Sequence, residues 1–88
     1  MRDKIELPEI EKWIARLDAA MPEVRSNGVI GDTFMSNIRA YHADTRHFIE
    51  KEDLVYAFEA IVWAWAWLES GVEAGALSCP SSLLRRFD

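Results

Sequence analysis

The chain has 88 residues, of which 50% are hydrophobic and 28% charged, which is the composition of one small globular domain and not of a disordered segment. Its net charge of −5 argues against binding to a nucleic-acid backbone, and its single cysteine, Cys79, allows no internal disulfide bond. The charged amino terminus is unlike a signal peptide, and the longest apolar stretch, residues 54–68, is shorter than the roughly 20 residues of a membrane span. We therefore expect a cytoplasmic protein with no membrane segment and no nucleic-acid partner.

The first predicted helix begins near Pro8 and ends before Pro22. Proline is favoured in the first turn of a helix, and apolar side chains then recur with helical spacing on one face. The following residues, 22–31, contain Asn27-Gly28 and a further glycine and have no sustained period, so they are predicted to form a loop. The apolar face of this first helix consists of Ile10, Trp13, Ile14, Leu17 and Met21.

The second predicted helix starts at an N-cap supplied by Asp32 or Thr33. Asp53 is the expected N-cap of the third helix, so the connection between the two helices is very short. Such a short connection makes the second and third helices antiparallel neighbours. The apolar stripe of the second helix contains Phe34, Met35, Ile38, Tyr41, Thr45, Phe48 and Ile49.

The third predicted helix extends from Leu54 to about Ser70, with Gly71 as the residue that follows its end. Apolar side chains cover about 280° of its circumference, more than two neighbours with stripes of about 120–140° can bury. Only a narrow wedge that includes Glu59 is polar. The side chains that need an additional cover are Tyr56, Trp63 and Trp67, and the cover is either the tail, through Leu77, Leu83, Leu84 and Phe87, or a second protein.

The remaining tail contains Gly75, Cys79-Pro80 and Ser81-Ser82, which predict a turn and then one further helical turn. We predict an all-α fold, an antiparallel three-helix bundle formed by residues 1–79. A short helical or irregular C-terminal tail, residues 80–88, follows it.

The second and third helices also carry a recognisable order of residues: Tyr and Asp, a turn, Ala-Phe, and then Trp-Leu-Glu-Ser-Gly. This order resembles a small archaeal family of unknown function, DUF357, over roughly residues 5–78. The resemblance implies a three-helix bundle and no established activity. Glu52 stands where the family favours Gly, so either a left-handed residue there costs about 1 kcal/mol or the turn takes another shape, and Ala66 replaces another Gly. The matching positions are Tyr41, Asp44, Phe48, Asp53, Ala57, Phe58, Trp67, Leu68, Glu69 and Gly71.

The polar side chains do not form a recognisable catalytic or metal-binding motif. His42 and His47 are five residues apart and cannot share a metal ion on one face of a helix, and Asp44 with His47 supplies two ligands where a closed site needs four. The spacing of Arg39 to either histidine does not fit a helical ribonuclease, and Cys79 has no base nearby. His42 is expected at the edge of the apolar stripe with a local hydrogen bond. We expect no catalytic residue, metal or cofactor.

The strongest candidate site is the aromatic surface of the third helix, where Tyr56, Trp63 and Trp67 lie with Glu59 as a polar anchor. Tyr41 with Asp44 forms a weaker candidate, a polar pair on the second helix. We expect a non-enzymatic interaction or self-association module, acting as a homo-oligomer or with a protein partner. The alternatives are a small-molecule groove near Trp63 and Trp67, and an accessory or nuclease-like domain around the two histidines.

Overall fold

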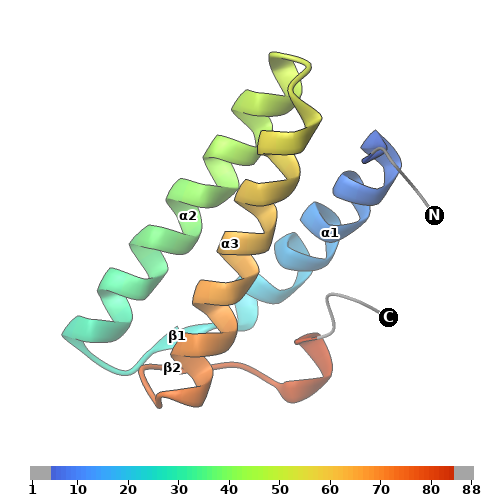
Figure 1. Ribbon diagram of the computed structural model, residues 1–88. Coiled ribbons are helices and arrows are strands. Elements are labelled where there is room, and N and C mark those ends of the chain that lie inside the picture. The colour runs from blue at the N-terminus through green and yellow to red at the C-terminus, as the bar shows by residue number, and fades with distance from the viewer. Residues whose placement is uncertain (1–4, 85–88) are drawn as a thin grey trace.

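The structure is a computed structural model that describes residues 5–84, and three α-helices account for most of that range (Figure 1). The predicted all-α class and the three helices are confirmed, and the structure adds a small two-stranded sheet that the sequence did not predict. None of the helices within residues 5–84 combines the length and the apolar character needed to cross a membrane. The elements are α1 (Leu7–Ala20), β1 (Arg25–Ser26), α2 (Val29–Glu50), α3 (Leu54–Glu73) and β2 (Leu77–Ser78), with 3-10 turns at Met21–Glu23 and Ser81–Leu83.

Helices α2 and α3 form a closely packed hairpin (Figure 1). They run in opposite directions and are joined by residues 51–53, as the sequence predicted. The Asp53 carboxylate caps α3, because its Oδ1 accepts a hydrogen bond from the Tyr56 N–H at 3.2 Å. Small buried residues on the side of α3 that faces α2 allow the two backbones to approach: Ala57, Ala60, Ala64 and Gly71.

Helix α1 packs against the other side of α3 (Figure 1). The ring of Trp13 lies 5.0 Å from that of Phe58, measured between centroids. The fully buried Trp65 donates its indole N–H to the carbonyl of Trp13 at 3.2 Å. These contacts join the two helices into one core, to which α1 contributes Ile10, Trp13, Ile14, Leu17 and Ala20.

Gly31, predicted in the loop before the second helix, and Gly71, predicted just after the third, both lie inside helices, so both predictions are wrong. Helix α2 begins at Val29, before the predicted caps Asp32 and Thr33, and so it contains the buried Gly31. Helix α3 passes through Gly71 and ends at Glu73. Both glycines are required for space, since a Cβ at position 71 would lie within 3 Å of the side chains of Leu77 and Phe34.

The tail returns to the segment that precedes α2 and closes this end of the hairpin. Strand β2 pairs antiparallel with β1, so that Arg25 lies opposite Ser78. Leu77 is buried, and the Asn27 side-chain amide donates to the Gly75 carbonyl at 2.9 Å. The predicted loop 22–31 is therefore partly ordered into a strand and the first turn of α2, and the division into 1–79 and 80–88 stays a prediction.

The connection between α2 and α3 contains one residue in the left-handed region, Glu52, with a φ of 59°. A side chain in this conformation costs about 1–2 kcal/mol, part of which glycine recovers. We predict that Glu52→Gly raises the free energy of unfolding by about 0.5–1 kcal/mol. Chemical denaturation followed by circular dichroism measures the change. The matched control is Lys51→Gly, which is expected to lower stability because Lys51 has an ordinary φ of −84°. If Glu52→Gly also lowered stability, Glu52 would not be strained.

The close approach of α2 to the strands predicts that Gly31 tolerates no side chain. A Cβ there would collide with the carbonyl oxygen of Ala76 and with Ser26, both of which belong to the closed end of the hairpin. We predict that Gly31→Ala lowers the free energy of unfolding by about 1–3 kcal/mol despite the better helix propensity of alanine. Ser36→Ala, at an exposed position of α2, is the control. Thermal unfolding measures the change. A Gly31→Ala variant that is as stable as the unaltered chain, or more stable, would contradict the prediction, because it would show that the strands move aside at no cost.

Candidate functional site

Three aromatic pairs connect α2 and α3 along one face of the hairpin. Each pair takes one ring from each helix, so the six side chains form a row that we call the aromatic ladder. Ring contacts of this kind contribute about 0.5–1.5 kcal/mol each beyond the area that they bury. The pairs are Phe34 with Trp67, Tyr41 with Trp63, and Phe48 with Tyr56, at centroid distances of 4.9, 6.1 and 5.4 Å.

The spacing of the aromatic residues explains why they share one face. On α2 they are seven residues apart, at 34, 41 and 48, which is two helical turns. On α3 they lie at 56, 63 and 67, again at seven- and four-residue intervals. Because the helices run in opposite directions, the first ring of α2 meets the last ring of α3. Phe34 and Phe48, predicted only as members of the apolar stripe of the second helix, therefore also belong to this face.

The ladder lies on the opposite side of α3 from α1. Phe58 and Trp65 face α1, whereas Trp63 points about 140–160° away from them around the helix axis. Tyr56 remains 53% exposed and Trp63 52% exposed. The 3-10 turn at Ser81–Leu83 contacts α1, and the Leu77 side chain lies beside Gly71 and Phe34 at the other end of the row. Whether the tail or a second protein covers Tyr56 and Trp63 stays a prediction, and Phe87 lies outside the described residues.

Two carboxylates flank the ladder. Asp44 on α2 and Glu59 on α3 are both exposed, and the pairing of the rings places them at the same level of the hairpin, between the second and third pairs. Within residues 5–84 no hydrogen bond joins Tyr41 to Asp44, and the Tyr41 ring instead stacks on Trp63. The predicted site residues therefore gather on one face, with the aromatic rings in its centre and an acid at each edge.

A shallow hollow lies at the Trp67 end of the ladder. Its volume is about 180 Å³, below the usual range of about 300–1,000 Å³ for small-molecule sites. The indole Nε1 of Trp67 is buried here and has no hydrogen-bond partner among residues 5–84. Ala66, which the family resemblance identified as a replacement for glycine, fills part of the space. The lining residues are Phe34, Trp63, Ala66, Trp67 and Ser70.

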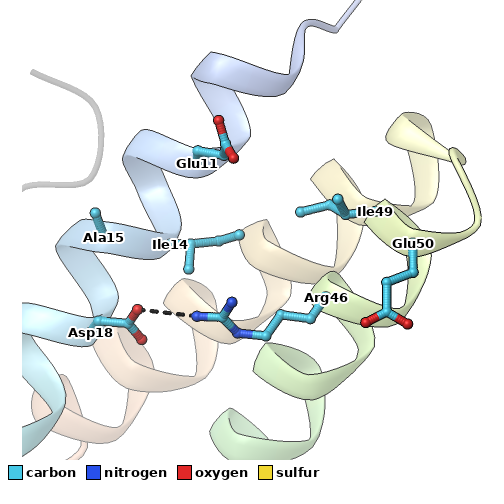
Figure 2. A pocket seen from close by; sticks show the side chains of 7 residues that line it. All are labelled: Glu11, Ile14, Ala15, Asp18, Arg46, Ile49 and Glu50. Carbon is cyan, nitrogen blue, oxygen red and sulfur yellow. Dashed lines mark hydrogen bonds and ion pairs between the residues drawn. The ribbon is translucent and has the colours of Figure 1, made fainter.

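A second groove separates α1 from α2 and has a volume of about 380 Å³ (Figure 2). Its floor is apolar and its rim is charged, and an ion pair spans it, because the guanidinium of Arg46 lies 3.4 Å from the Asp18 carboxylate. The lining residues are Glu11, Ile14, Ala15, Asp18, Arg46, Ile49 and Glu50.

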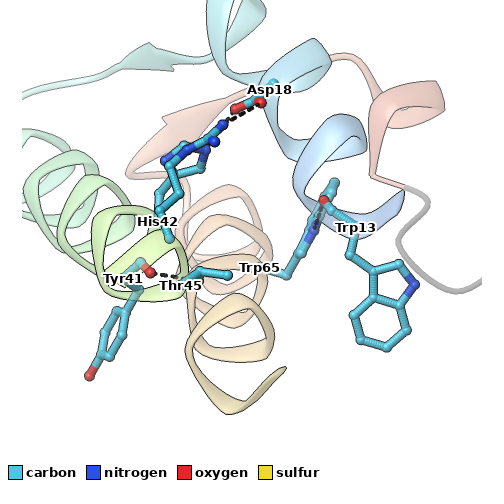
Figure 3. Close-up of polar contacts among 7 residues, drawn as sticks. Trp13, Asp18, Tyr41, His42, Thr45 and Trp65 are labelled. Carbon is cyan, nitrogen blue, oxygen red and sulfur yellow. Dashed lines mark hydrogen bonds and ion pairs between the residues drawn. The ribbon is translucent and has the colours of Figure 1, made fainter. Parts of the chain in front are cut away.

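Asp18 also binds His42, whose Nε2 lies 2.7 Å from its Oδ1 (Figure 3). His42 lies at the edge of the apolar stripe as predicted, but its partner is on α1 and not local, so that prediction is wrong. His47 is exposed and contacts the ring of Phe48. No group of three or more potential metal ligands occurs in the described part of the chain. The contacts of Asp18 with His42 and Arg46 therefore connect α1 to α2.

Cys79 is partly buried beside the 3-10 turn that follows β2. Burial, and to a lesser degree the negative charge of Glu23, raise the pKa of the Cys79 thiol. A raised pKa keeps the sulfur protonated near neutral pH, and a thiol is a poor nucleophile. This environment agrees with the expectation of an unreactive cysteine.

Comparison with known proteins supports the fold that these helices build. The sequence model of a protein family of unknown function, DUF357, matches residues 8–77. The crystal structure of protein AF1782 from Archaeoglobus fulgidus, which carries the same family model, is similar over 83% of this chain and 91% of that one. The two share 46% sequence identity and superpose with a TM-score of 0.74. No curated protein is significantly similar to the chain. The match over most of its length shows that the chain belongs to the DUF357 family.

Proposed function

We propose that this antiparallel three-helix bundle is a small cytoplasmic, non-enzymatic module that associates with protein through the aromatic ladder. The observation that carries the proposal is Trp63, which stacks on Tyr41 and yet keeps half of its surface exposed. Trp and Tyr are enriched at protein interfaces, where they supply most of the binding energy from a small central area. The function is thus assigned to a surface and not to a catalytic group.

The dimensions of the ladder suit a partner helix. Phe34 and Phe48 are 14 positions apart on α2, so the ladder extends for about 20 Å along the helix axis. The exposed side chain of Ile30, one turn before Phe34, prolongs the apolar strip. A helix laid along it would contact both α2 and α3 on the side that α1 leaves open.

The rings are also held in place before any partner binds. Each one packs against a ring of the other helix, and α2 and α3 themselves are fixed by close contact through Ala60 and Ala64. A preorganised surface loses little side-chain entropy on association, so more of the contact energy contributes to affinity.

The two alternative functions have less support. The hollow beside Trp67 is small for a ligand site, and the side chains of His42, Asp44 and His47 point to different sides of α2. A hydrolytic reaction needs a nucleophile, a base and an orienting group together. Neither a small-molecule function nor an accessory hydrolytic function therefore matches the geometry as well as an interface does.

We predict that Trp63→Ala weakens association through the ladder by about 30-fold, corresponding to about 2 kcal/mol for a central interface residue. Because half of the ring is exposed, the variant is expected to keep its helical circular dichroism and a cooperative unfolding transition. Light scattering over a hundredfold dilution measures self-association, and titration with helical peptides measures binding to a partner.

The matched control for this prediction is Val55→Ala. Val55 is exposed and apolar and lies on the same helix, outside the ladder, so its truncation is expected to leave association within twofold of the unaltered chain. A chain that stays monomeric over the whole range and binds no helical peptide through this face contradicts the proposal.

A further inference from the structure

We infer that the ladder binds a basic amphipathic helix of another protein, with apolar side chains over the rings and Arg or Lys side chains at its acidic edges. The inference rests on the proposed interaction function and names the chemistry of the partner. It follows from the charges around the ladder, from the exposed faces of its rings, and from the symmetry that a dimer would need.

The charge on the α3 side of the ladder is entirely negative within the described residues. Residues 52–84 contain five acidic residues and no Lys or Arg, and α3 lies wholly within this segment. Glu59 borders the ladder on α3, and Asp44 borders it on α2. Neither of them forms an ion pair with another residue in the range 5–84. A complementary partner must therefore be positively charged at these two edges.

The aromatic rings add a second attraction for the same cations. Glu59 lies three residues after Tyr56 and four before Trp63, so all three side chains emerge on one side of α3. Both rings are about half exposed. A guanidinium or ammonium group held near the Glu59 carboxylate would therefore also reach an aromatic face, and Trp is the best such face among the side chains.

A second copy of the chain fits this face poorly. In a two-fold symmetric dimer the same patch of both copies meets, so the acidic edges of one copy would pack against a face that carries the same acids. Like charges brought together in an interface are unfavourable. This charge pattern favours a basic partner over a second copy, and we expect self-association to use another surface.

The acidic side chains differ in their ion pairs between the α1–α2 groove and the ladder. The central carboxylate of the groove, Asp18, already has His42 at 2.7 Å and Arg46 at 3.4 Å. Asp18 thus has its cations within the chain, whereas Asp44 and Glu59 at the ladder have none among residues 5–84. The missing positive charge is what the partner supplies.

The experiment uses the full chain and two synthetic 18-residue helical peptides as probes. Both peptides carry leucine along one stripe, and they differ only in the flanking positions, which are Arg in one and Glu in the other. Fluorescence anisotropy of the labelled peptide measures the dissociation constant at 50 and 200 mM salt. We expect the Arg peptide to bind at least tenfold more tightly than the Glu peptide, and more weakly at high salt.

Variants of one carboxylate separate a local effect from net charge. Glu59→Gln is expected to weaken the Arg peptide by about fivefold, while Glu50→Gln stays within twofold, because Glu50 is exposed on the α1 side of α2. Both variants change the net charge equally. Trp63→Leu keeps apolar contact but removes the aromatic face, and it is expected to reduce the preference for Arg over Glu.

The outcomes distinguish this inference from the proposed function. Equal effects of Glu59→Gln and Glu50→Gln, equal affinity for the two peptides, or no binding of the Arg peptide up to 1 mM would each overturn the basic-helix partner. A wild-type dimer that Trp63→Ala dissociates would also overturn it, while supporting an interface at the ladder. If Trp63→Ala alters neither self-association nor peptide binding, both the inference and the proposed function are wrong.

Discussion

The close contact between α2 and α3 is the constraint on which the rest of the structure depends. Its basis is the row of small residues on α3, including Ala57, Ala60 and Ala64, which leaves no room for a large side chain between the helices. The aromatic residues of α3 must then occupy its two flanks. On one flank Trp65 meets α1, and on the other Trp63 meets Tyr41 of α2.

The same close packing explains the two glycines that lie inside helices. Gly31 allows the segment around β1 and β2 to approach α2, and Gly71 makes room for Leu77 of the returning tail. With that end closed and α1 on one flank, the described chain has no further element to place on the other. Within residues 5–84 the aromatic ladder is open because these residues cover only one flank of a hairpin that is apolar on both.

Much of this arrangement could be predicted from local sequence. Helical periodicity located three helices, the Asp53 cap followed from side-chain chemistry, and the width of the apolar arc on α3 indicated rings without a cover. Gly71 was misplaced because local preference favours glycine after a helix, whereas here packing against Leu77 keeps it within one. The two-residue strands are too short for any period to reveal. The partners Phe34 and Asp18 depend on the register between helices, which a single sequence does not contain.

The exposure of Trp63 supports the proposed role of the ladder in association. A ring that stabilises only the hairpin would gain most from full burial, as Trp65 does at 0% exposure, since apolar burial contributes about 25 cal/mol for each Å². Trp63 stacks on Tyr41 but leaves half of its surface in water. A smaller aliphatic side chain at this position would also contact α2 and would expose less apolar area to water. The neighbouring Glu59 is exposed, so its side chain is likewise not needed to stabilise the fold. An aromatic ring and a carboxylate that has no ion pair within residues 5–84 lie on one open helical face, and both are features that the proposed interface with a basic helix would use.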